Sequence, residues 1–193
     1  MTVISENGGM IVVASVGTDH HPFTRLADWL ERWIQHNRDI EVRFQHGATR
    51  PIAGAHNVDR LAHRELLAWL EQADAVVLQG GPGGIMDSLS VGIRPIVVPR
   101  IARLNEVVDD HQVDFCARLH SEGVITVATS RQGVDTLLDQ TVEGTLDWRA
   151  ERDEGTPPGV LAIKDQLRTP PRRTDSIWHR ARALRSGRKH AVK

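Results

Sequence analysis

Two kinds of hydrophobic pattern alternate along the chain. Short apolar runs are typical of buried strands, and they predict strands over residues 10–16, 40–44, 75–78, 95–98 and 124–128. Apolar residues at helical spacing predict helices over residues 23–34, 63–72, 110–122 and 133–140. A further helix is expected between the third and fourth strands, and a short strand at the end of the loop over residues 48–58. This alternation predicts a Rossmann-like α/β fold, a parallel sheet with helices on both faces.

The pattern also divides the chain into parts. We expect a flexible lead-in over residues 1–9, and one α/β domain over residues 10–140, which no repeat or break interrupts. Residues 141–193 are rich in Pro and Arg and predict a basic, partly disordered tail. Within it, residues 174–186 could form a basic amphipathic helix. Such a helix can lie on an anionic membrane surface, and a solvated or partner-bound tail is the alternative.

The central stretch, residues 73–98, contains the most informative motif. Its apolar strand ends at Gln79, and Gly80, Gly81, Gly83 and Gly84 follow before a helix and another strand. Glycines let the main chain approach a bound group closely, and a helix start offers free N–H donors and the positive end of the helix dipole. The motif therefore suits a phosphate. A tight strand-to-helix connection without a ligand is the alternative interpretation.

The charge distribution argues against a nucleic-acid-binding domain. The 193 residues carry a net charge of −1, from 24 Lys/Arg and 25 Asp/Glu. Residues 164–193 hold ten of the basic and two of the acidic residues, so the rest of the chain has 14 basic and 23 acidic ones. Nucleic-acid-binding domains usually carry their basic surface on the folded part.

Cysteine content and hydropathy bear on the compartment. The single cysteine, Cys116, excludes an internal disulfide framework and fits a reducing compartment. No apolar run approaches the roughly 20 residues needed to span a bilayer, and the N-terminus does not resemble a signal peptide. We therefore expect a cytoplasmic protein, and a peripheral position at the inner face of the membrane stays open. Cys116 itself has no surrounding cationic pattern of the kind that marks a reactive thiol, and it is expected in the core.

The glycine motif does not fit two familiar phosphate-binding fingerprints. It lacks the Lys-Ser/Thr ending of a P-loop, and Met86 stands where the third glycine of a dinucleotide fingerprint belongs. The segment after the first strand is not such a fingerprint either. Both observations disfavour ATP cleavage and NAD-linked chemistry.

Several motifs follow the predicted strands in order. They are VGTDHHPF at 16–23, QHG at 45–47, ADAVVLQGGPGGIMD at 73–87, PIVVPR at 95–100 and DDHQ at 109–112. As an ordered set they resemble the C-terminal half of family 28 glycosyltransferases, the nucleotide-sugar-binding half of a GT-B fold. In scope the chain is similar to the soluble subunit of two-chain UDP-sugar transferases, such as the dolichol-linked N-acetylglucosamine transferase and bacterial exopolysaccharide transferases.

The resemblance assigns positions in the donor site. It places the diphosphate at residues 79–84, that is Gln79, Gly80, Gly81, Gly83, Gly84 and the next helix start. Gly17 and Thr18 would line the same cleft, Asp87 would accept hydrogen bonds from the ribose hydroxyls, and the His111-Gln112 pair would contact the sugar. An amide suits a hydroxyl because it both donates and accepts.

Other residues receive weaker assignments. Asp19 and His20 lie where a cleft loop is expected and are the candidate catalytic or positioning groups, although in two-half enzymes the base tends to come from the other half. The ten histidines are scattered and predict no metal site. Two departures from the family are Gln79, where it often has His, and Gly84, where it often has Thr or Ser. The lost hydroxyl would remove one phosphate hydrogen bond, on the order of 1–3 kcal/mol.

The leading hypothesis is therefore a hexosyltransferase-type glycosyltransferase subunit. It would move a sugar, with inversion, from a UDP-sugar to a lipid-linked or polysaccharide acceptor, without a further cofactor. A membrane-associated partner subunit would supply the acceptor half. The alternative, favoured by Gln79 and Gly84, is a non-catalytic nucleotide-sugar-binding or regulatory protein. A UDP-GlcNAc epimerase on the same fold would need a chain about twice as long.

Overall fold

The computed structural model describes residues 9–149, which contain six strands and five α-helices. The strands are β1 (Ile11–Ser15), β2 (Glu41–Gln45), β3 (His56–Val58), β4 (Ala75–Gln79), β5 (Ile96–Val98) and β6 (Thr126–Val127). The helices are α1 (Thr24–His36), α2 (His63–Gln72), α3 (Pro82–Ser90), α4 (His111–Ser121) and α5 (Arg131–Val142), with a 3-10 turn, η1 (Ala102–Leu104).

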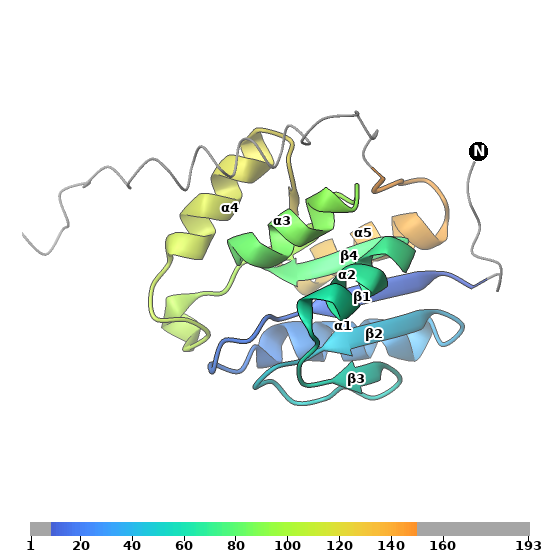
Figure 1. Cartoon of the computed structure of the whole chain (residues 1–193), viewed down its shortest axis with the longest axis horizontal. Helices are drawn as coiled ribbons and strands as arrows, with labels where there is room; N and C mark the ends of the chain where they lie inside the picture. The colour runs from blue at the N-terminus through green and yellow to red at the C-terminus, as the bar shows by residue number, and fades with distance from the viewer. Residues whose placement is uncertain (1–8, 150–193) are drawn as a thin grey trace, which may run out of the picture. The chain divides into compact units, whose positions relative to one another are not determined.

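The strands form one parallel sheet in the order β3-β2-β1-β4-β5-β6. Helices α1 and α5 contact each other on one face, and α2 and α3 contact each other on the other (Figure 1). All five residues of β1 and all three of β5 are buried, because central parallel strands are covered on both sides. The predicted Rossmann-like α/β fold is confirmed.

Helix α1 shows how the sequence pattern becomes packing. Its apolar positions recur at helical spacing, and Leu26, Ala27, Leu30, Trp33 and Ile34 are its buried residues. The Trp33 indole N–H donates to the Asp139 carboxylate at 2.7 Å, which ties α1 to α5 on the same face of the sheet. Burial of this helix face is what fixes the position of the loop that precedes α1.

Two elements differ from their predicted extent. β6 is a two-residue strand where the apolar run predicts five residues, and α5 begins two residues before Gly133. The reason for the earlier start is the N-cap: the Ser130 hydroxyl accepts a hydrogen bond from the Gly133 N–H at 3.1 Å. Gly133 therefore occupies the third helical position, where its lack of a side chain does not end the helix.

The fold continues past Gln140, the end of the predicted domain. Helix α5 ends at Val142, and Trp148 is 1% exposed. The Trp148 indole N–H donates to the Thr141 hydroxyl at 2.6 Å, and its carbonyl accepts from the Arg94 N–H at 2.8 Å. Residues 141–149 thus pack on the sheet domain. Outside the described residues lie residues 1–8 of the predicted lead-in over residues 1–9, the tail from residue 150 and its basic helix over residues 174–186.

Among residues 9–149, no helix combines the length and apolar character required to cross a membrane.

Candidate functional site

The strand order reverses direction between β1 and β4. From β1 the chain builds outward through β2 and β3, and then returns to place β4 on the other side of β1. In open α/β sheets, ligands bind at the carboxyl ends of the strands at such a switch point, because the two flanking loops diverge there. The loops at this point are residues 16–23, after β1, and Gly80-Gly81, after β4.

Helix α3 begins directly at this crevice. Gly81 is its N-cap residue and Pro82 its first residue, so Gly83 and Gly84 already lie in the first helical turn. No side chain caps this helix start. Gly83 is exposed and Gly84 half-buried, so their N–H groups, which have no acceptor within the helix, can meet a ligand.

The glycine motif is not a left-handed turn. None of its four glycines has a positive φ, whereas Gly17 does, at 73°. Close contacts surround the first two glycines instead, with Cys116 at Gly80 and the flexible Gln79 side chain at Gly81. A Cβ at Gly80 would lie 2.9 Å from the Cys116 Sγ, and one at Gly81 would lie 2.2 Å from the Gln79 side-chain nitrogen. The same nitrogen lies 3.0 Å from a Cβ built on Gly17, so the Gln79 side chain lies between the two loops.

Helix α4 also contacts the glycine motif. Gln112 lies against Gly80, and its side-chain oxygen accepts from the Arg100 N–H at 3.3 Å. Its neighbour His111 is exposed, and the His111 ring bonds the Asp109 carboxylate. Of the predicted His111-Gln112 pair, the structure therefore brings Gln112 to the glycine motif and places His111 toward solvent.

Cys116 lies under Gly80 and is fully buried, as predicted. Its thiol faces the Gly80 carbonyl oxygen at 3.9 Å. Burial raises the pKa of the Cys116 thiol to about 12. We expect iodoacetamide to alkylate Cys116 at pH 8 roughly a thousandfold more slowly in the folded protein than in urea, because the thiolate is the nucleophile.

The same pKa shift also affects stability. The pKa of Cys116 is higher in the folded protein than in the unfolded chain, so the contribution of this thiol to the free energy of unfolding is complete below about pH 9 and is lost as the pH rises toward 12.

Mass spectrometry of the alkylated protein measures the rate of alkylation by iodoacetamide. Comparable rates for the folded and unfolded protein would show that the thiol is accessible.

Asp87 lies on α3 and pairs with the first residue of α2. Its carboxylate bonds the His63 ring nitrogen at 2.9 Å, and the Asp87 side chain is 23% exposed. A carboxylate offers about four acceptor sites, so one bond to His63 leaves capacity for a ligand hydroxyl. His63 had no sequence-based assignment, because nothing local links it to Asp87.

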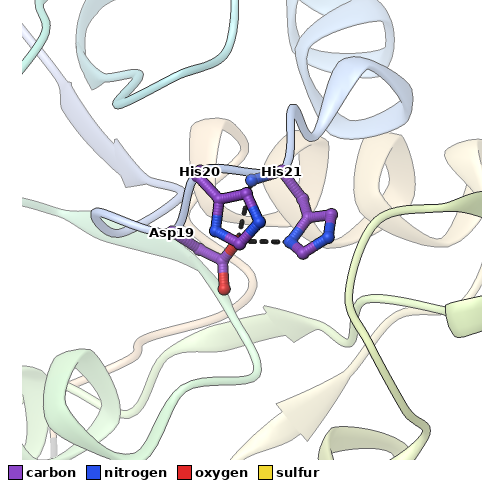
Figure 2. A group of neighbouring side chains, drawn as sticks. All are labelled: Asp19, His20 and His21. Carbon is purple, nitrogen blue, oxygen red and sulfur yellow. Dashed lines mark hydrogen bonds and ion pairs between the residues drawn. The ribbon is translucent and has the colours of Figure 1, made fainter.

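Asp19, His20 and His21 lie together in the loop between β1 and α1. Figure 2 shows their side chains on the same side of the loop backbone. One Asp19 oxygen accepts from the His21 N–H at 2.8 Å and lies 2.7 Å from the His21 Nδ1. Burial raises the pKa of Asp19, but the His21 hydrogen bonds and the Arg100 charge outweigh it, so the pKa of this carboxyl is lowered.

Arg100 fixes the backbone of this loop. Its side chain is fully buried, and its guanidinium donates to the carbonyls of Val16 at 2.9 Å, His21 at 2.8 Å and Glu106 at 2.8 Å. It also lies 4.7 Å from the centre of the Phe23 ring. Desolvation lowers the pKa of Arg100, while Asp19 and Glu106 act in the opposite direction. One cation thus joins the β1–α1 loop to the β5–α4 loop.

Glu106 completes this network. Its two carboxylate oxygens accept from Nε and Nη2 of Arg25, each at 2.8 Å, and one of them also accepts from the Ile101 N–H at 2.9 Å. Such two-point pairing fixes both side chains, and so connects α1 to the β5–α4 loop. Neither Arg100 nor Glu106 was assigned a role from sequence. An arginine directly after a buried parallel strand was the available signal for Arg100.

A hollow of about 510 Å³ lies beside the N-terminal half of α1. Arg25 lines it and is paired with Glu106, while Arg131 lines it and is paired with Asp135 at 2.8 Å. Carboxylates pair with these two arginines, and a third, Arg32, also lines the hollow. The switch point is the candidate site because a helix begins there without a side-chain cap.

Solved structures with a similar fold include several glycosyltransferases. The calicheamicin glycosyltransferase CalG4 matches with a TM-score of 0.51 and 11% identity over 82% of this chain. The glycotransferase of kitacinnamycin matches with 0.49 and 18% over 87%, and SnogD from Streptomyces nogalater with 0.41 and 16% over 83%. No protein-family model matches the sequence, and neither does any curated protein.

The chain spans only part of these enzymes, covering 38% of CalG4, 40% of the kitacinnamycin enzyme and 43% of SnogD. All three are glycosyltransferases. The described residues have the α/β, Rossmann-like fold that CalG4 shares.

Proposed function

We propose that this domain binds the donor of a glycosyl transfer, a UDP-sugar, at the switch point between β1 and β4. The observation that carries the proposal is the uncapped start of α3 in that crevice, where the N–H groups of Gly83 and Gly84 and the helix dipole favour an anion. The diphosphate is the most strongly charged part of a nucleotide-sugar, so its binding at this helix start fixes the rest of the donor.

The other groups around the crevice then take defined roles. Asp87, oriented by His63, accepts from the ribose hydroxyls, and Gln112 contacts the sugar. Asp19 and His20 face the crevice from the β1–α1 loop and position the acceptor or the donor. Charge builds on the leaving diphosphate during transfer, so donors fixed at α3 stabilise the transition state more than the ground state. The displacement proceeds with inversion.

A partner supplies the rest of the enzyme. The chain spans 38% of the length of CalG4, and in this proposal the domain supplies one wall of a two-sided cleft. We assign the acceptor site and the membrane contact to a second, membrane-associated subunit. The two chains together form a hexosyltransferase of the family 28 type at the cytoplasmic face of the membrane.

The binding step can be tested by substitution at Gly83. A Cβ there meets nothing within 4 Å, so a side chain fits. Gly83→Glu places a carboxylate in the first turn of α3, where it favours the helix but repels a diphosphate. We expect calorimetry to show at least tenfold weaker UDP binding than in the native chain.

Two controls make this result specific. Gly83→Ala is expected to bind UDP within about threefold of the native chain and to be more stable by about 0.5–1 kcal/mol, since alanine favours a helix. Uridine, which lacks the diphosphate, is expected to bind equally to the native chain and to Gly83→Glu. Equal UDP binding by Gly83→Glu and Gly83→Ala would place the diphosphate elsewhere and overturn the proposal.

A non-catalytic nucleotide-sugar-binding protein is the second candidate. The observation that favours it is the Gln79 side chain, which lies between Gly17 and Gly81. An assay of sugar transfer with and without the partner subunit separates the two functions. Donor binding with no transfer in the reconstituted pair would favour the binding protein.

A further inference from the structure

The β1–α1 loop gathers three groups that can ligate a metal ion. The Asp19 carboxylate and the rings of His20 and His21 each offer one ligand atom, and these atoms all lie within 4.8 Å of one another. The three side chains lie on the same side of the backbone (Figure 2). The His20 side chain is 85% exposed and that of Asp19 is 37% exposed, so an ion can reach them from solvent.

The separations suit a small, tetrahedral ion. Zinc bonds to nitrogen and oxygen at about 2.0–2.2 Å, which places neighbouring ligand atoms of a tetrahedron roughly 3.3 Å apart. The His21 Nδ1 lies 2.7 Å and the His20 Nδ1 3.7 Å from the same Asp19 oxygen, on either side of that value. The His20 ring is 85% exposed and the His21 ring 23% exposed, so rotation of the His20 ring is the easier way to equalise the two distances.

The backbone that carries the ligands is already fixed. Arg100 donates to the carbonyl of His21 at 2.8 Å and to that of Val16 at 2.9 Å, from a fully buried position. A bound ion therefore does not have to order the loop, which would otherwise weaken its binding. The nearby Arg100 charge opposes a cation, and the negative Asp19 carboxylate offsets it.

The chain contains an internal comparison for this motif. At Asp109-Asp110-His111 the first carboxylate again accepts from the N–H and ring of the residue two positions on. There the middle residue is Asp110, and its carboxylate accepts from the Ala102 N–H at 2.9 Å. Within residues 9–149, only the Asp19 loop gathers three such ligand atoms.

We infer that Asp19, His20 and His21 form a binding site for a divalent transition-metal ion of the zinc class. Two imidazoles and one carboxylate are ligands that zinc accepts readily, and three protein ligands leave a fourth position for water or an anionic oxygen. The sequence pattern alone predicts no metal site at these histidines. The site does not depend on the proposed donor binding, because all three ligands come from one loop.

Titration with Zn²⁺ alone, without nucleotide, tests the inference. We expect the full-length chain to bind one Zn²⁺ in a saturable step by calorimetry, and Co²⁺ to give the visible absorption of a four-coordinate ion. His20→Ala is expected to weaken Zn²⁺ binding at least tenfold. Because the His20 side chain is exposed, this variant should fold normally, which circular dichroism checks.

His111→Ala is the matched control, since it removes an exposed histidine from the similar Asp109 turn. We expect it to bind Zn²⁺ as the native chain does. Absence of saturable binding, or equal affinities for His20→Ala and the native chain, would overturn the inference. UDP binding measured with a chelator present reports separately on the proposed function, so one can fail without the other.

Discussion

Replacement of Arg100 by methionine is expected to lower the free energy of unfolding by roughly 3–5 kcal/mol. The guanidinium is buried and serves three carbonyls, those of Val16, His21 and Glu106. Each buried acceptor left without a donor costs about 1–3 kcal/mol. Burial of the cation also has a cost, which the lowered pKa of Arg100 reflects, and its relief keeps the loss below the full sum.

Thermal and urea unfolding measure this effect. For a domain of this size, the loss corresponds to a decrease in Tm of roughly 10 °C. Arg103→Met provides the control, because Arg103 is exposed in the same β5–α4 loop, and its replacement should change stability by less than about 0.5 kcal/mol. Equal stabilities of the two variants would show that the loops hold their positions without the buried cation.

Gly47→Ala should have the second largest effect, a loss of about 2–4 kcal/mol. Gly47 follows β2 with a φ of 52°, and a Cβ there would lie 2.5 Å from the Gly17 carbonyl oxygen. That atom belongs to backbone, so the clash cannot be relieved by rotating a side chain. The β1–α1 loop must move, and UDP binding is expected to weaken with it.

Gly123→Ala separates the two causes. Gly123 has a similar φ, 72°, but a Cβ there meets nothing within 4 Å. Its replacement carries only the cost of the left-handed backbone, about 1–2 kcal/mol. The difference between the two variants in urea unfolding thus measures the contact between the Gly47 and Gly17 loops. A difference of zero would contradict that contact.

The fold could be predicted from the sequence because its strands are short apolar runs, which are typical of buried parallel strands. Val76, Val77 and their neighbours have to be covered on both faces, which demands a central parallel strand. Cys116 was placed in the core on other grounds, because no cationic pattern around it marks a reactive thiol. Trp148 could not be placed this way, since the contact that buries it, with the backbone of Arg94, joins residues far apart in the sequence.

The site was less predictable than the fold. The position of the glycine motif at the carboxyl end of β4 followed from local pattern, but the reason for its glycines did not. A Cβ at Gly80 would contact Cys116, and one at Gly81 would contact the Gln79 side chain, whereas neither glycine has a positive φ. The network of Arg100 and Glu106 could not be predicted for a similar reason: its bonds connect two loops and helix α1, which only the folded sheet brings together.

The buried Arg100 guanidinium has one more consequence, which concerns communication across the molecule. Because it donates hydrogen bonds to the carbonyls of both Val16 and Glu106, the β1–α1 loop and the β5–α4 loop cannot shift independently. Whatever orders one of them orders the other, and by thermodynamic reciprocity the influence runs equally in both directions.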